Sequence, residues 1–193
     1  MQTKRLLMKA LGASALLPAV SVTSHAQARQ SQEEQYFPDA IVETHDGRKI
    51  RFYQDAIKGK VVIFNMMYTA CTNICPPNTA SLLNVQNALG ERVGRELFMY
   101  SITLQPEIDT PAALRDYTGR YGVKPGWTFL RAQRRDLETI RRKLGFFNTD
   151  PVADADISKH TGMIRIGNER VDRWFMVPAI APTRQIVSSI LNV

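Results

Sequence analysis

Residues 61–78 read VVIFNMMYTACTNICPPN, and this stretch decides the fold. The apolar run 61–67 is typical of a central strand that is buried on both faces of a sheet. Two cysteines, Cys71 and Cys75, follow it, and two prolines come next. Proline fits the first turn of a helix because the amides there lack intrahelical partners. The stretch therefore predicts a buried strand, a short loop with both cysteines, and a helix over 78–89.

The segments on either side of this stretch alternate between strand and helix patterns. Residues 41–44 and 50–53 flank a turn and predict an N-terminal β-hairpin. After the first helix the patterns predict strand 97–104, helix 111–121 capped by Asp109 or Thr110, strand 127–130 and helix 134–144. Loop 148–159 follows. The chain then closes with a hairpin of strands 161–166 and 170–175, which turns at Gly167 and Asn168, and with helix 183–191. This order predicts an α/β fold, a thioredoxin-like sandwich with a central mixed β-sheet flanked by helices.

The N-terminus has the three parts of a secretory signal peptide. Basic residues come first, the apolar run 10–22 follows, and the segment ends at the A-x-A site 26–28. Cleavage after Ala28 would leave a flexible lead-in over 29–37 and one domain over 38–193. We therefore expect a periplasmic or otherwise exported protein, which is membrane-associated only if the signal is kept as an anchor. No apolar run reaches the roughly 20 residues of a spanning helix.

Charge narrows the classes of partner. The whole chain carries a formal charge of +7, and without residues 1–28 it has 22 basic and 18 acidic side chains, or +4. No stretch combines clustered Lys and Arg with aromatics, so no nucleic-acid surface is predicted. A local basic cluster over 131–143 is interpreted as the solvated face of a helix, and docking of an acidic partner is the alternative.

Cys71 and Cys75 are the only cysteines of the chain. In an exported protein two cysteines default to a disulfide, but a loop this short gains little stability from being closed. Their position before a helix favours thiolates, because a helix N-terminus stabilises negative charge. The spacing therefore predicts a redox-active or metal-ligating dithiol. An inert disulfide in a binding module is the alternative.

Two histidines remain beyond the signal, and they have different expected roles. His45 lies in the predicted hairpin turn and is expected to be exposed. His160 precedes a strand of the closing hairpin, and a thioredoxin-like topology brings that loop beside the dithiol. Two thiolates and one imidazole suit Cu(I) as well as Cu(II). Structural zinc normally needs a fourth ligand, and two cysteines are too few for an iron–sulfur cluster.

Several stretches resemble the Sco/SenC family of copper chaperones, and the likeness spans about residues 38–192. They are residues 59–64, 68–76, 106–111, 121–123, 127–129 and 160–163. The resemblance implies a thioredoxin-like fold that holds copper through Cys71, Cys75 and His160. It also implies that the protein delivers copper to, or keeps reduced the thiols of, a copper site in a respiratory oxidase such as cytochrome c oxidase. The implied partners are that client and a thiol reductant protein.

Three positions near the motifs depart from the pattern of this family. Asn73 and Lys159 stand where the family usually has acids, and Gln105 stands where it often has Asp. Groups around a metal site orient its ligands and tune its affinity, so these changes bear on the balance between copper and redox work. The three implied ligands are all retained.

An enzyme is the alternative to a chaperone. In a thiol-disulfide oxidoreductase Cys71 would attack a client disulfide and Cys75 would resolve the mixed disulfide. A peroxiredoxin pattern would need proline and threonine at the positions that Phe64 and Tyr68 occupy. The chaperone hypothesis leads, because a histidine is dispensable for dithiol exchange but useful for copper. Met66, Met67 and Met163 are expected to fill the core rather than to bind metal.

Overall fold

The computed structural model describes residues 36–159 and 162–193. The predicted signal peptide, most of the predicted lead-in, His160 and Thr161 lie outside the described residues. Phe37, at the end of the predicted lead-in, is buried and packs against Trp174, so the packed domain begins before residue 38. No helix within the described ranges has the length and apolar character needed to cross a membrane.

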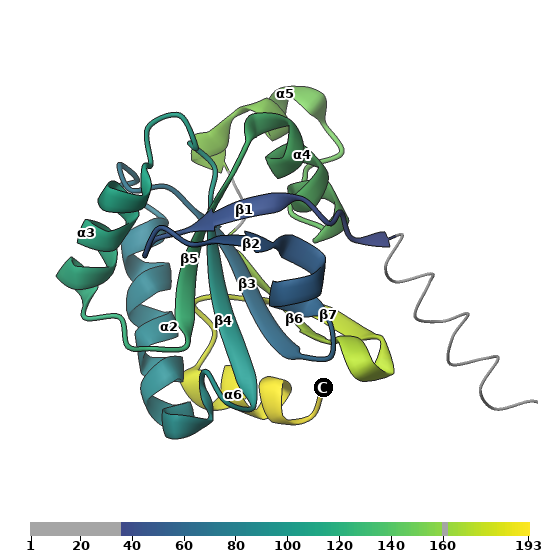
Figure 1. Cartoon of the computed structure of the whole chain (residues 1–193). Coiled ribbons are helices and arrows are strands. Elements are labelled where there is room, and N and C mark those ends of the chain that lie inside the picture. Colours follow the sequence, from purple (N-terminus) through teal and green to yellow (C-terminus); the bar gives the residue numbers. More distant parts are fainter. Residues whose placement is uncertain (1–35, 160–161) are drawn as a thin grey trace, which may run out of the picture. The chain divides into compact units, whose positions relative to one another are not determined.

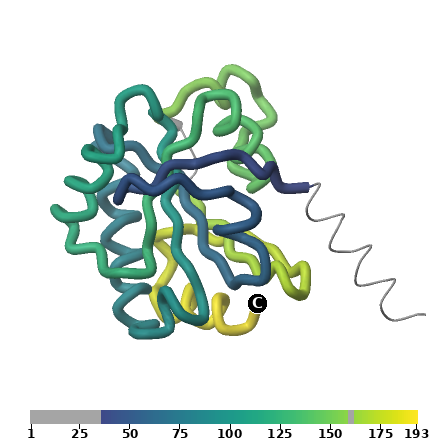
Figure 2. The backbone as a smooth tube through the Cα atoms, in the orientation of Figure 1, coloured from purple at the N-terminus to yellow at the C-terminus, as the bar shows by residue number. Residues whose placement is uncertain are grey.

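Seven strands form one mixed sheet with the order β2-β1-β5-β4-β3-β6-β7 (Figure 1). The strands are β1 (Ile41–Thr44), β2 (Lys49–Arg51), β3 (Val61–Met67), β4 (Leu97–Thr103), β5 (Trp127–Ala132), β6 (Met163–Asn168) and β7 (Arg173–Pro178). The three central strands β3, β4 and β5 are parallel, whereas the pairs on either side are antiparallel. The N-terminal hairpin therefore lies beside β5, although the two are far apart in sequence (Figure 2). The predicted thioredoxin-like α/β class is confirmed.

Helices cover both faces of this sheet. They are α2 (Cys75–Leu89), α3 (Pro111–Tyr121), α4 (Arg134–Lys143), α5 (Pro151–Ala155), α6 (Thr183–Leu191) and the π-helix η1 (Phe52–Ile57). Residues of α2, α3 and α6 share one hydrophobic cluster, and residues of η1 and α4 share the other. Alternate residues of β3, Ile63 against Phe64 for example, belong to the two clusters. Its nearly unbroken apolar run therefore reflects burial on both faces.

Two predicted boundaries near the dithiol and the hairpin were wrong. Helix α2 begins at Cys75 rather than at Asn78, because both prolines belong to its first turn, where no amide donor is needed. The second strand of the N-terminal hairpin ends at Arg51, where the prediction continued to Tyr53. The chain turns there into η1, which buries Phe52 and Tyr53 under the sheet.

Two further corrections concern the C-terminal half. Residues 148–159 are not all loop, since they contain α5, whose N-cap Asp150 accepts a hydrogen bond from the amide of Val152. The second hairpin turns at residues 169–172 rather than at 167–168. Gly167 lies within β6 and pairs with Trp174 of β7. The Trp174 ring occupies the space that a Cβ at residue 167 would need.

The basic cluster over 131–143 is only partly a solvated face. Four of its arginines form ion pairs with acids elsewhere in the domain: Arg131 with Glu43, Arg134 with Glu107, and both Arg141 and Arg142 with Asp154. Arg141 is buried, and it also donates to the backbone oxygen of Phe146 at 2.8 Å. Much of this positive charge therefore neutralises acids within the domain, and less of it than predicted faces solvent.

Candidate dithiol site

Both cysteines lie where β3 passes into α2. Cys71 follows the strand by four residues, and Cys75 is the first residue of the helix. The amide of Cys75 donates to the Sγ atom of Cys71 at 3.3 Å, and the amide of Cys71 donates to the Tyr68 carbonyl at 3.1 Å. Cys71 is 8% exposed and Cys75 is 2% exposed, and neither is in a disulfide. The sulfur of Cys71 is therefore held at the N-terminus of α2, as the sequence predicts.

The surroundings of the two thiols separate their pKa values. Burial opposes ionisation of Cys71, but hydrogen bonds from the Cys75 thiol and from the amides of Cys75, Asn73 and Ile74 outweigh it and lower the pKa of Cys71. Burial, followed by the hydrogen bond to Cys71, raises the pKa of Cys75 to about 12. Cys71 therefore ionises first, and Cys75 stabilises its thiolate as a donor.

Tyr68 is a member of the site that the sequence prediction missed. Burial and then a hydrogen bond with the Cys71 side chain raise the pKa of its hydroxyl to about 12. The hydroxyl thus stays protonated at neutral pH and adds a donor beside the Cys71 sulfur. Only its position three residues before Cys71 could have drawn attention to it.

Asp109 is a second missed residue, since the sequence predicts only a possible helix cap there. Thr110 caps α3, accepting from the amide of Ala113, and Asp109 is completely buried. Its carboxylate accepts from the Thr69 amide at 3.1 Å and from the hydroxyls of Thr69 and Thr103. Asp109 therefore ties the loop before Cys71 to the end of β4.

His160 lies outside the described residues, but Gly162 is described and lies against the dithiol helix. A Cβ built on Gly162 would lie 3.5 Å from Ile74 Cγ2 and 3.5 Å from Asn78 Nδ2. Ile74 and Asn78 flank Cys75 in the first turn of α2. Within the described ranges no three His, Cys, Asp or Glu side chains form a group that could hold a metal. The described part thus brings the two predicted sulfur ligands together, and the role of Cys71, Cys75 and His160 as a ligand set remains a prediction.

His45 and the methionines have structural roles. His45 is half-buried and its Nδ1 accepts a hydrogen bond from the amide of Phe129 at 3.2 Å. Because His45 is half-buried, the expectation of an exposed turn residue was wrong. Burial lowers the pKa of His45 in spite of the adjacent Asp46. Met66 and Met67 are buried in the two clusters, and Met163 packs against one of them. The predicted core role of all three methionines is confirmed.

Comparison with known proteins gives two kinds of sequence match. A family model described as SCO1/SenC matches residues 31–191. The SCO1 protein homolog of Bacillus subtilis is 29% identical over 90 residues, which are 46% of this chain and 45% of that protein. That pairwise match therefore spans less than half of the relative's length.

Solved structures share the fold at low sequence identity. A SCO1/SenC family lipoprotein from Bacillus anthracis is 18% identical, with a TM-score of 0.66 over 81% of this chain and 93% of that one. Bradyrhizobium japonicum ScoI, solved with copper bound, is 19% identical, with a TM-score of 0.63 over 79% of this chain and 96% of that one. Both have the architecture described above.

Proposed function

We propose, from the premise that this chain belongs to the SCO1/SenC family, that it binds copper through Cys71, Cys75 and His160 and passes the metal to a partner protein. The observation that carries this proposal is the pair of reduced, adjacent cysteines at the start of α2. The backbone that follows His160 lies against the same helical turn, at Gly162. A client copper site in a respiratory oxidase such as cytochrome c oxidase is the finer proposal, and it rests on the family.

The donor set suits copper as cargo. Thiolates are soft ligands that favour Cu(I), and an imidazole adds affinity for Cu(II). Cys71 ionises more readily than Cys75, so the Cys71 thiolate is the first ligand available at neutral pH. The Cys75 thiol must lose its proton as the metal binds, which couples copper affinity to pH. A cargo site benefits from this coupling, because protonation of Cys75 favours release.

Copper titration of the reduced protein tests this proposal. We expect one copper per chain, with thiolate-to-copper charge-transfer absorption for Cu(II). The absorption should vanish in Cys71→Ala and Cys75→Ala and weaken or shift in His160→Ala. His45→Gln is the matched control, because this histidine contacts β5 rather than the dithiol, and it should bind like the wild type. A reduced protein that binds neither Cu(I) nor Cu(II) tightly would exclude the chaperone function.

A thiol-disulfide oxidoreductase is the second candidate, and the separated thiol pKa values favour it. The Cys71 thiolate would attack a client disulfide and release one client thiolate. Cys75 would then lose its proton and attack the Cys71 sulfur, releasing the second client thiol. The client is reduced and the protein is left with a Cys71–Cys75 disulfide, which a thiol reductant protein must reduce.

Trapping separates the two candidates. Cys75→Ser should accumulate a mixed disulfide with a disulfide-bonded client, whereas Cys71→Ser should trap none. An oxidoreductase without a copper role would trap clients equally well in Cys75→Ser with and without His160→Ala, and the wild type would show no tight copper binding.

We also infer that residues 1–28 direct export. The family includes a protein described as a lipoprotein, which is consistent with export or membrane association. Mass spectrometry of the protein recovered from a periplasmic extract should give a chain that starts at Arg29. An intact N-terminus in the cytoplasmic fraction would contradict this inference.

A further inference from the structure

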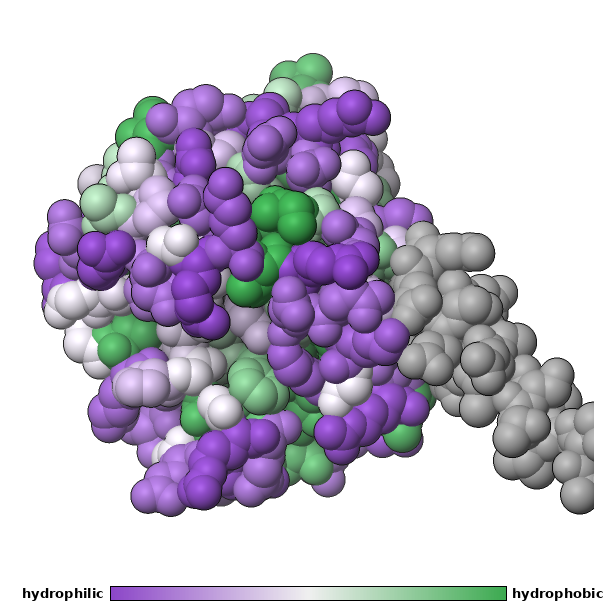
Figure 3. All heavy atoms as spheres, viewed as in Figure 1, coloured by the Kyte–Doolittle hydropathy of each residue, from purple (hydrophilic) through white to green (hydrophobic). Residues whose placement is uncertain are grey.

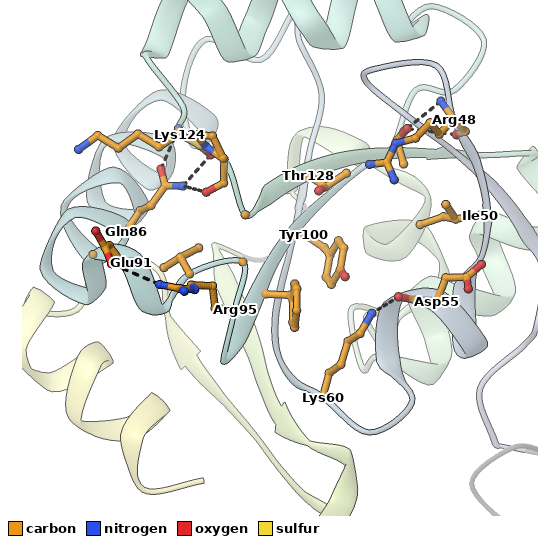
Figure 4. Close-up of a pocket in the computed structure, with 17 residues that line it drawn as sticks. Arg48, Ile50, Asp55, Lys60, Gln86, Glu91, Arg95, Tyr100, Lys124 and Thr128 are labelled. Carbon is orange, nitrogen blue, oxygen red and sulfur yellow. Dashed lines mark hydrogen bonds and ion pairs between the residues drawn. The ribbon is translucent and has the colours of Figure 1, made fainter.

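A groove of 1010 Å³ opens at the opposite end of the sheet from the dithiol. Lys60, Phe98 and Gly126 lie at or next to the first residues of β3, β4 and β5, whereas Cys71 follows the last residue of β3. The β1–β2 hairpin and η1 form one side of the groove, and the segment after α2 forms the other (Figure 4). A ligand held there would leave the dithiol accessible.

The floor of the groove is aromatic and carries the hydroxyl of Tyr100. Tyr100 is 6% exposed and stacks on Phe64 at 5.2 Å between ring centroids, and Phe98 lies beside it half-buried. Within residues 36–159 and 162–193 the Tyr100 hydroxyl has no hydrogen-bond partner, and it is directed into the groove (Figure 4). Among the described residues, the buried side-chain polar atoms that lack a hydrogen-bond partner belong to Gln105, Arg165 and Asn168, so the Tyr100 hydroxyl reaches solvent through the groove and is available to a ligand there.

Positive charge predominates around this floor. Lys60 lies 4.8 Å from the centroid of the Phe98 ring, and its ammonium donates to the backbone oxygen of Asp55 rather than to a carboxylate. Arg48 stands across the groove and forms an ion pair with the exposed Asp46. Four cationic and two acidic side chains line the groove. On the face that carries the hairpin, apolar atoms lie recessed between hydrophilic ones (Figure 3).

We propose that this groove binds an extended acidic segment of a partner protein, with carboxylates on Lys60 and Arg48 and an apolar side chain on Phe98 and Tyr100. A small ligand fits less well, because small-molecule sites are lined mostly by apolar side chains, whereas four cationic and two acidic side chains line this groove. The charge of +4 beyond residue 28 favours acidic partners generally, since complementary charge steers association. The proposal is independent of copper, because none of these residues belongs to the dithiol site.

Calorimetric titration of the reduced, metal-free protein with a short peptide of alternating glutamate and phenylalanine tests the groove. Its counterpart of alternating glutamine and phenylalanine keeps the shape without the charge. The double variant Lys60→Met with Arg48→Gln should bind the acidic peptide at least tenfold more weakly than the wild type. Tyr100→Phe keeps the stacking on Phe64 and should weaken binding about fivefold, the effect of one hydrogen bond.

The matched control is Arg135→Gln with Arg184→Gln, which removes the same charge from exposed positions outside the groove. It should bind the acidic peptide within about twofold of the wild type, since distant surface charges act weakly in physiological salt. Equal losses in the two double variants would show non-specific attraction and overturn the proposal. Equal binding of the glutamine peptide, or binding of phenylacetate as tight as that of the acidic peptide, would also overturn it.

Discussion

Two carboxylates hold the two segments that lead to the proposed copper ligands, and they do so by different means. Asp109 fixes the loop before Cys71 through one amide and two hydroxyls, all neutral donors. Asp154 fixes α5, on the path to His160, through the guanidinium groups of Arg141 and Arg142. The Arg141 contacts measure 2.6 Å and 2.8 Å, and the Arg142 contact measures 3.0 Å.

The difference between these two anchors follows from what lies next to each. A guanidinium beside the thiols would stabilise both thiolates and repel a copper cation. Neutral donors fix the loop without placing a cation there, so burial, the helix amides and the thiols themselves dominate the thiol pKa values, and the nearby Asp109 charge adds to the raised pKa of Cys75. The α5 segment contains no predicted ligand, and an ion pair there perturbs no thiol. One anchor therefore depends on hydrogen bonding alone, and the other on charge.

Asp109→Ala should break the neutral anchor and have the largest effect. The buried Thr103 hydroxyl and two part-buried donors of Thr69 lose their acceptor, so we expect the free energy of unfolding to fall by about 3 kcal/mol. Urea unfolding of the reduced, metal-free protein measures this. Asp109→Asn keeps an acceptor oxygen and should lose clearly less. Equal stability of Asp109→Ala and the wild type would contradict the anchoring role.

Asp154→Asn should break the charged anchor, at a cost of about 2 kcal/mol at neutral pH, because two arginines lose their anionic partner. Hydrogen bonds and charge from Arg141 hold the pKa of Asp154 well below its ordinary value of 3.8. The carboxylate therefore contributes its full stability above about pH 5, and that contribution declines progressively as pH falls below 3.8 towards the lowered pKa of the folded state. Unfolding at several pH values checks this. A gap between wild type and variant that is as large at pH 2 as at pH 7 would be inconsistent with it.

Alkylation rates sharpen the comparison at the thiols. In the reduced, metal-free protein Cys71 should react with iodoacetamide at least tenfold faster than Cys75 at pH 7, because the thiolate is the reactive form. The pKa of Cys71 is lowered, whereas that of Cys75 is raised to about 12. Mass spectrometry of time points identifies the labelled residue. Equal rates, or a faster Cys75, would refute this asymmetry.

Tyr68→Phe should give the smallest effect. Loss of the hydroxyl removes one donor from the Cys71 sulfur, so the pKa of Cys71 should rise and its alkylation below that pKa should slow by about threefold. The pH dependence of the alkylation rate shows the shift directly. Tyr121→Phe, on α3, is the matched control and should leave the rate unchanged. An unchanged Cys71 profile in Tyr68→Phe would remove this residue from the site.

Sequence patterns predicted the elements that bury long apolar faces. The bounds 61–67 of β3 and 183–191 of α6 match the prediction, and so does the helix capped by Thr110. Short elements were missed, because the five residues of α5 and the six of η1 carry too little periodicity to be recognised. Their stability comes from Arg141 and from burial under the sheet, and both are contacts with distant residues.

The sequence by itself determined the thioredoxin-like class and the position of two thiols at a helix start, because hydrophobic periodicity, proline and cysteine spacing are local properties of the chain. Only the tertiary structure decided that Asp109 is a buried anchor, that Arg141 is an internal counterion and that Tyr100 faces a cationic groove. Each of these roles depends on residues brought together from separate strands and helices. The physical reason is that burial and hydrogen bonding are set by non-local contacts, which no local pattern encodes.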